Sequence, residues 1–440
     1  MIKNRRLVLA ISFSLFTSAN VYASGGDPIR GRAPLTALLL DAREGHAGPL
    51  KEAFFEKQID FFLDFEQGRS KIVAELANLR EAGRAVESND FAQADQRIRG
   101  IQNFPDQKQY LRAVLDAAQG RHQQSLEGFR QLIDRRAKLD SKRMVMLSFM
   151  GAARVFHEIQ DYKAAIYHYN QVRQLESEFY ESVFEKGWSF YLNGDMNGAL
   201  GATLTFQSPF FESAFYPETS VVRTAAFFQL CYFDRAAATA QDAKRSWEPV
   251  QRQIRELANR DPRSWLFDER LLKGIDTRVM GALVADSRFR SALRARIGLE
   301  KEVKELGNRR EAALASQALS TIKNRLVNEA SRVLRNADKS ITDMLSQMDI
   351  IAIEILQASA NQILGRPPDE QANVKIIDLG DVDFDAQVQF WPFKGEFWVD
   401  ELGSYYYGLK SNCESDGLNS AIKSKLYAGA LRRKAVQKAF

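Results

Sequence analysis

The sequence predicts a mainly α-helical protein in which a solenoid of repeated helix pairs precedes a long helix and a small β-containing closing segment. Three observations predict this fold class. A pattern of small and bulky residues recurs after 34 positions in the middle of the chain. Residues 289–365 are rich in helix-forming residues and contain no proline, whereas residues 366–413 are rich in aromatic and β-branched residues.

The first 23 residues are typical of an export signal. Lys3, Arg5 and Arg6 form a basic start, residues 7–16 are apolar, and residues 21–23 (Val-Tyr-Ala) form a small-residue cleavage site. The apolar stretch is too short to span a bilayer, which takes roughly 20 residues. A buried N-terminal helix is the alternative interpretation. We expect a periplasmic protein without a transmembrane span, associated with the outer membrane only through partners.

The charge of the chain argues against a nucleic-acid partner. The formal net charge is +5, and removal of residues 1–23 takes away three basic residues and no acidic one, which leaves +2. Proteins that bind nucleic acid usually carry a clear basic patch. We therefore expect protein partners.

Two consecutive stretches, residues 146–179 and 180–213, match when one is shifted by 34 positions. The shift pairs Ala153 with Gly187, Phe156 with Phe190, Asp161 with Asp195, Tyr162 with Met196, and Ala165 with Ala199. This period and order resemble the tetratricopeptide repeat, in which two helices pack through a small residue, an aromatic residue, a turn and an alanine. Chance similarity between two amphipathic helix pairs is the alternative.

Weaker copies flank these two repeats, so we expect about five helix pairs within residues 75–248. Upstream copies contain Asp90, Phe91, Ala94 and Ile98, and then Gly120, His122, Ser125 and Phe129; a downstream copy contains Phe233, Ala236, Ala240 and Ala243. Residues 24–74 are expected to form an N-terminal helical cap and residues 249–288 a helical connector. Stacked pairs form a solenoid with an extended concave surface that suits binding of a peptide or protein.

The predicted long helix covers residues 289–365, interrupted only by Gly298 and Gly307 before the closing glycine. Unbroken, it would be roughly 110 Å long. Its apolar stripe consists of Leu319, Ile322, Leu326, Ala330, Val333, Ala337, Ile341, Leu345, Met348 and Ala352, a spacing typical of eleven-residue repeats. The solenoid, a hairpin partner starting near Leu299, or a second molecule in a homodimer could cover this stripe.

No motif of a known catalytic, metal or cofactor site is present, so we expect a non-catalytic protein without a cofactor. The four histidines lack metal-ligand spacing, and there is no H-E-x-x-H, paired C-x-x-C, G-x-S-x-G or phosphate loop. Asp381, Asp383 and Asp385 could open a calcium loop, but Ala386 and Pro392 stand where such a loop needs Gly and Glu. Their alternation with apolar residues favours a strand.

The closing segment begins where Pro367 and Pro368 end the helix. We expect strands near residues 374–379, 387–393 and 405–410, followed by a tail helix over 414–440. Residues 390–393 (FWPF), 395–398 (GEFW) and 400–403 (DELG) resemble the end of exported tetratricopeptide-repeat proteins associated with adventurous gliding motility in myxobacteria and relatives. The resemblance implies a periplasmic or outer-membrane-associated component of a multiprotein envelope machine. It assigns no role to a particular residue.

The aromatic and acidic residues of this segment are the candidate interaction site. They are Trp391, Phe393, Trp398, Asp400, Glu401, Tyr405, Tyr406 and Tyr407. One interpretation is a small core that folds onto the long helix, and the other is an exposed surface that binds protein or cell-wall glycan. The first function we consider is a non-catalytic scaffold of the cell envelope. The second is a glycan-binding or glycan-processing protein with Asp400 and Glu401 as paired carboxylates.

The chain has two cysteines, Cys231 and Cys413. An oxidising compartment would allow them to form a disulfide. Two buried thiols are the alternative, because free cysteine is among the most buried residue types.

Overall fold

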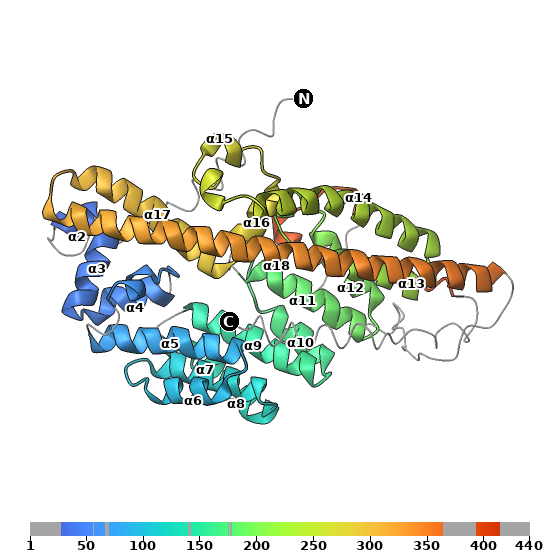
Figure 1. The fold of residues 1–440 in the computed structure, drawn as a ribbon. Helices are drawn as coiled ribbons and strands as arrows, with labels where there is room; N and C mark the ends of the chain where they lie inside the picture. The colour runs from blue at the N-terminus through green and yellow to red at the C-terminus, as the bar shows by residue number, and fades with distance from the viewer. Residues whose placement is uncertain are drawn as a thin grey trace. The chain divides into compact units, whose positions relative to one another are not determined.

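The computed structural model describes residues 28–55, 57–66, 70–139, 142–174, 176, 178–363 and 393–413. These residues are mainly helical and include no strand (Figure 1). The prediction of a mainly α fold is therefore confirmed. The chain divides into two compact units: the first holds the chain up to Ala77 with Ser287–Asn328, and the second holds Asn78–Asp286 with the chain from Glu329.

Five consecutive helix pairs form most of the second unit, and this arrangement is consistent with an α solenoid. The pairs are α5 (Lys71–Glu87) with α6 (Phe91–Arg99), α7 (Pro105–Ala118) with α8 (His122–Asp134), α9 (Lys142–Glu158) with α10 (Tyr162–Tyr169), α11 (Phe179–Leu192) with α12 (Met196–Thr205), and α13 (Thr219–Gln229) with α14 (Phe233–Ala258). The first turns of α5 belong to the first unit. The pairs span Lys71–Ala258, and the sequence places about five pairs within residues 75–248.

Each helix pair turns through one residue in the left-handed backbone region. The five residues are Asn89, Gly120, Gln160, Gly194 and Cys231. A left-handed residue after a helix lets the next amide close the final turn. In the two clearest repeats this amide belongs to Asp161 or Asp195, whose carboxylate also accepts a hydrogen bond from the third residue of the following helix. The same residue therefore ends one helix and starts the next.

The second helix of every pair packs through a small residue five positions after the turn. Ala94, Ser125, Ala165, Ala199 and Ala236 are each 0 % exposed. A small side chain lets two helix backbones approach closely, which explains why the repeat keeps this position small.

The predicted packing residues lie between the paired helices. Ala153 and Ala165 belong to one buried cluster, against which Phe156 packs. Phe190 packs against the equivalent cluster of α11 and α12. A Cβ added at Gly187 would lie 3.4 Å from the Cβ of Ala202.

The connector and the first unit are also helical. The connector contains η4 (Pro262–Ser264), α15 (Glu269–Leu272) and α16 (Thr277–Ala285). The first unit contains α2 (Pro28–Arg32), α3 (Pro34–Glu44), α4 (Ala47–Phe55), η1 (Phe61–Asp64), α17 (Ser287–Leu306) and the start of α18 (Arg310–Ile363).

Within the first unit, α17 caps the start of α3 through Glu302. The buried carboxylate accepts hydrogen bonds from the backbone amides of Leu35 and Thr36 at 2.6 and 2.8 Å. The Thr36 hydroxyl donates a third at 2.6 Å. Burial raises the pKa of Glu302, whereas these three donors lower it. A carboxylate at a helix N-terminus satisfies amides that lack a partner within the helix.

The long helix predicted over residues 289–365 is divided at Gly307, so of the alternatives that the sequence left open the chain forms a helical hairpin here. That residue has φ +55°, which interrupts the helix between α17 and α18. The two helices run in opposite directions (Figure 1), and Lys323 of α18 forms an ion pair with Glu300 of α17 at 3.1 Å. α18 alone is 54 residues long, and residues 364–365 lie outside the described residues.

The part of α18 in the second unit packs against α13 and α14. The Thr224 hydroxyl contacts the sulfur of Met348, and Gln251 donates to the side chains of Asp338 and Thr342. The apolar stripe is therefore covered within the chain along this part. After Ile341 the buried residues are Met344, Met348, Ile351 and Ile355, whereas the predicted Leu345 and Ala352 are half-exposed.

Candidate interaction site

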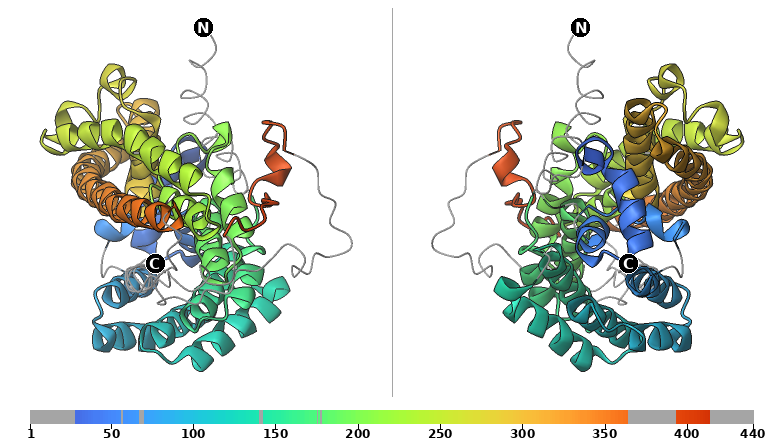
Figure 2. Two further views of the ribbon diagram at one scale, coloured as in Figure 1. Left: turned by 90° about the vertical axis from the view of Figure 1, so that its right-hand side faces the viewer. Right: turned by 90° about the vertical axis from the view of Figure 1, so that its left-hand side faces the viewer.

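The closing segment, defined here as residues 393–413, lies along α11, α12 and α13. In both views of Figure 2 it lies on the side of these helices opposite to α18. Its hydrogen bonds to other helices go to the stack, from Gln174 after α10 to Tyr232 before α14. The expectation that this segment folds onto the long helix is therefore wrong, because the helix pairs provide the surface for it.

The expected strand at residues 405–410 is also absent. This stretch is irregular and makes its backbone hydrogen bonds to α12 instead of to a neighbouring strand. The Tyr407 amide donates to the Asn197 backbone oxygen at 3.1 Å, and the Asn197 side chain binds the amide and the carbonyl of Leu409 at 2.9 and 3.0 Å. One asparagine therefore holds three backbone groups of the segment. The expected strand over 374–379, most of the one over 387–393, and the tail helix lie outside the described residues.

Gly201 allows the backbone of the segment to lie directly on α12. A Cβ at this position would be 1.8 Å from the carbonyl oxygen of Tyr405. Every residue of α12 is buried, because the segment covers the side that the neighbouring helices leave open. Gly403 has φ +86° and lies against Phe179 and Val183 of α11. Gly201 is thus required by the close approach of two backbones, and Gly403 by its left-handed backbone conformation against two side chains of α11.

Lys186 of α11 is a buried cation beneath the segment. Its Nζ donates to the carbonyl oxygen of Gly403 at 2.7 Å and to the side-chain oxygen of Asn170 at 2.8 Å. The Gly403 amide in turn donates to the Thr205 hydroxyl at 3.1 Å. Burial lowers the pKa of Lys186 from 10.5 to about 8.

The shifted pKa of Lys186 predicts that stability rises with pH. Between the folded pKa of about 8 and the unfolded value of 10.5, the unfolded chain binds more protons than the folded chain. We expect the free energy of unfolding of the wild type, relative to Lys186→Met, to increase by about 2 kcal/mol between pH 7.5 and 9.5. Urea unfolding at several pH values measures this difference. The exposed Lys163→Met is the control, and parallel pH curves for wild type and Lys186→Met would contradict the prediction.

The predicted tyrosines face the helix pairs. The Tyr406 hydroxyl donates to the Asp195 carboxylate at 2.8 Å, and the Arg223 guanidinium donates to the Tyr407 hydroxyl at 2.9 Å. Burial raises the pKa of Asp195, and burial together with Asp195 raises the pKa of Tyr406. The residue that caps α12 therefore also holds the segment.

Phe393 and Trp398 lie on the outer side of the segment, whereas Tyr405 packs with Phe397 against the core cluster of α11 and α12. Phe393, Phe397 and Tyr405 form a cluster of edge-to-face rings with centroids 5.1–5.8 Å apart. Trp398 is 61 % exposed and Phe393 is 46 % exposed. Asp400 and Glu401 lie in the turn η6 (Val399–Glu401), and Trp391 lies outside the described residues.

Cys231 and Cys413 form a disulfide in the structure. Cys231 is the left-handed turn residue between α13 and α14, so the bond fixes the end of the segment to the fifth helix pair. Just before it, the Asn412 amide donates to the Leu230 carbonyl at 2.9 Å. Of the two interpretations left open by the sequence, the structure adopts the disulfide.

Sequence reasoning missed the residues that receive the segment. Gln174, Lys186, Asn197, Gly201 and Thr205 hold its backbone. A signal was present in the alignment of the repeats, because Lys186 stands where the preceding repeat has Ala152, and Gly201 where it has Tyr167. A lysine in a packing position and a glycine in place of a tyrosine are both departures from the repeat, and here both contact the backbone of the segment.

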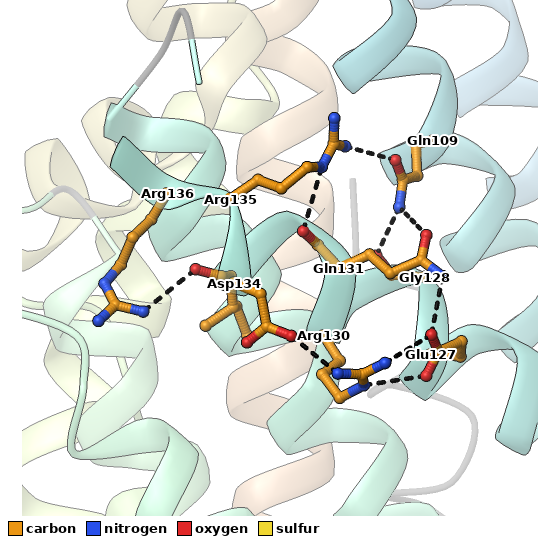
Figure 3. A network of polar contacts seen from close by, with 9 residues as sticks. Gln109, Glu127, Gly128, Arg130, Gln131, Asp134, Arg135 and Arg136 are labelled. Carbon is orange, nitrogen blue, oxygen red and sulfur yellow. Dashed lines mark hydrogen bonds and ion pairs between the residues drawn. The ribbon is translucent and has the colours of Figure 1, made fainter. Parts of the chain in front are cut away.

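An open groove lies over α9, between α8 and α10. It has a volume of about 1500 Å³, and α7 also contributes to its lining. Val145, Phe149 and Ala152 form part of its apolar floor. Along α8 the rim is polar, as Figure 3 shows: Arg130 binds Glu127 and Asp134, and Gln109 of α7 binds the Gly128 carbonyl and the Gln131 side chain.

The described residues include no group of three or more His, Cys, Asp or Glu side chains arranged to hold a metal ion. Within the same part of the chain, no helix combines the length and the apolar character needed to cross a membrane.

No family model matches the chain, and a search of curated proteins finds no significantly similar sequence.

Proposed function

We propose that this protein is a non-catalytic scaffold that binds other proteins of the cell envelope through its helix pairs. The observation that supports this proposal is that the stack holds an irregular stretch of polypeptide, its own closing segment. Recognition uses side-chain hydrogen bonds to backbone groups together with apolar contacts, as at Lys186, Asn197 and Leu402. Surfaces of stacked helix pairs are suited to extended partners.

The proposed compartment is the periplasm, with association to the outer membrane through partners. The pattern of residues 1–23 and the Cys231–Cys413 disulfide support export to an oxidising compartment. The resemblance of the closing segment to gliding-motility tetratricopeptide-repeat proteins supports a role in a multiprotein envelope machine.

Capture of partners tests this function. The oxidised full chain, immobilised and incubated with envelope extract, is expected to retain the same proteins in repeated experiments after a high-salt wash, as identified by mass spectrometry. Heat-unfolded, reduced protein on the same support is the control. Failure to retain any protein beyond this control would overturn the scaffold proposal.

A glycan-binding function is the second candidate, favoured by the exposed Trp398 beside the Phe393 ring cluster. Exposed aromatic side chains offer flat apolar surfaces for a ligand to contact. Sedimentation with purified peptidoglycan distinguishes the two functions: co-sedimentation that Trp398→Ser abolishes would support glycan binding. If the protein neither co-sediments with peptidoglycan nor releases soluble fragments from it, the glycan function is excluded.

A further inference from the structure

We propose that the open groove over α9 binds an extended segment of another protein that carries acidic residues beside large apolar side chains. This inference deepens the scaffold function and rests on it. It identifies a site and a class of ligand, neither of which depends on the closing segment being displaced.

The floor of the groove is equivalent to the floor that already binds the closing segment. A shift of 34 positions carries Val145, Phe149 and Ala152 of α9 onto Phe179, Val183 and Lys186 of α11. All three α11 residues lie against one residue of the segment. A Cβ at Gly403 would be 3.2 Å from Phe179 and 3.1 Å from Val183, and Lys186 Nζ lies 2.7 Å from the Gly403 oxygen.

One wall of the groove is equivalent as well. The same shift carries Tyr167, His168 and Gln171 of the groove onto Gly201, Ala202 and Thr205. Gly201 touches the Tyr405 carbonyl, Ala202 shares a core cluster with Leu402, and Thr205 accepts from the Gly403 amide. The groove is therefore the same kind of site one helix pair earlier. Because one of these two sites holds an irregular peptide stretch that includes the turn at Gly403, the other is suited to a peptide ligand as well.

The substitutions between the two sites favour a different ligand from the closing segment. Tyr167 stands in place of Gly201 and is 62 % exposed, so a peptide backbone cannot lie as close to α10 as it does to α12. Ala152 stands in place of Lys186, so the floor offers an apolar surface where the occupied site offers a donor to a carbonyl. The ligand must therefore direct large apolar side chains, instead of its backbone, into the floor.

The charges on the rim favour acidic residues in the ligand. Arg130 is paired with Glu127 and Asp134 (Figure 3), and Arg112 is paired with Asp95. Those carboxylates are already neutralised by arginines of this chain. By contrast, Arg136 and Arg173 line the groove and are exposed, and neither has a carboxylate partner among the described residues. Two such guanidinium groups favour carboxylates on a ligand.

Peptide selection tests this inference on the oxidised full chain. A displayed library of random 16-residue peptides is selected on the immobilised protein, and enriched peptides are synthesised and measured by fluorescence anisotropy. We expect enriched sequences to combine Asp or Glu with large apolar residues. The double variant Arg136→Glu/Arg173→Glu should weaken their binding about tenfold or more, because it replaces attraction by repulsion. The control Arg252→Glu/Arg270→Glu, which reverses two exposed charges outside the groove, should change binding less than twofold.

The outcomes separate this inference from the scaffold function. The proposal is overturned if the groove variant binds every enriched peptide as tightly as the wild type does, or if the enriched peptides are basic. It is also overturned if the wild type is a dimer and the groove variant is a monomer, since the ligand would then be a second copy of this chain. A synthetic peptide of residues 371–390 that binds with the same dependence on Arg136 and Arg173 would overturn it too, since the ligand would then be part of this chain. If the groove variant captures the same envelope proteins as the wild type, the groove is not the binding site for them, whereas the scaffold function is still supported.

Discussion

Replacing both cysteines with serine, Cys231→Ser/Cys413→Ser, is expected to lower the free energy of unfolding by about 2–5 kcal/mol. The bond joins residues 182 positions apart, so it restricts a large part of the unfolded chain. In the chain-entropy account, the destabilisation on removing a disulfide grows with the length of the closed loop. Urea unfolding of the oxidised wild type and of the double variant measures the difference.

A reducing agent provides the matched control for the disulfide. Reduction of the wild type should lower its stability by nearly the same amount, whereas the double variant should not respond. Both cysteines are in the disulfide, so no free thiol complicates this comparison. A wild type that loses less than about 0.5 kcal/mol on reduction would contradict the prediction, because the cross-link would then contribute little.

The repeat could be predicted from sequence because its determinants are local. The spacing from the turn residue to the buried alanine is the same in both clear copies, Gln160 to Ala165 and Gly194 to Ala199. A helix pair is specified by residues within about 34 positions, and both its turn and its small residue are visible in the sequence. Weaker copies became clear only in the structure, where Asn89 and Cys231 adopt the left-handed conformation that favours glycine.

The break in the long helix was harder to predict because a single glycine is tolerated in many helices. Gly298 and Gly307 look alike in sequence, yet only Gly307 leaves the helix. Gly298 stays helical within the first unit, and a Cβ there would lie 2.4 Å from the Leu35 side chain. One glycine therefore serves a close contact and the other a turn, and tertiary packing decides between these roles.

The site of the closing segment could not be predicted because its partners are far away in the sequence. The Asn197 side chain contacts a residue 212 positions later, and Lys186 one 217 positions later. The aromatic residues indicated a packing or docking role, but they did not indicate which surface they contact. The local sequence pattern does not indicate whether the aromatic residues contact the long helix or the helix pairs. Only the mismatched residues of the repeats, Lys186 and Gly201, pointed to α11 and α12.

Gly201→Ala is expected to displace the closing segment from α12, although alanine is the better helix former. The substitution should strengthen the helix by about 1 kcal/mol. Its Cβ, however, would be 1.8 Å from the Tyr405 carbonyl oxygen, so the backbone of the segment must move. That movement disrupts three hydrogen bonds to the segment, one each at Lys186 Nζ, the Thr205 hydroxyl and Asn197 Oδ1, each worth about 1 kcal/mol net. The balance is a loss of about 2 kcal/mol.

Limited digestion with chymotrypsin shows where this loss occurs. Tyr405, Tyr406 and Tyr407 are half-buried in the wild type, and their cleavage rate should rise about tenfold or more in Gly201→Ala because the local cost of opening falls. The disulfide at Cys413 keeps the cleaved end attached, so the products separate only after reduction. Gly408→Ala is the matched control on the segment itself, since a Cβ there meets nothing within 4 Å. Equal cleavage rates in all three proteins, with Gly201→Ala more stable than wild type, would show that helix propensity outweighs the contact.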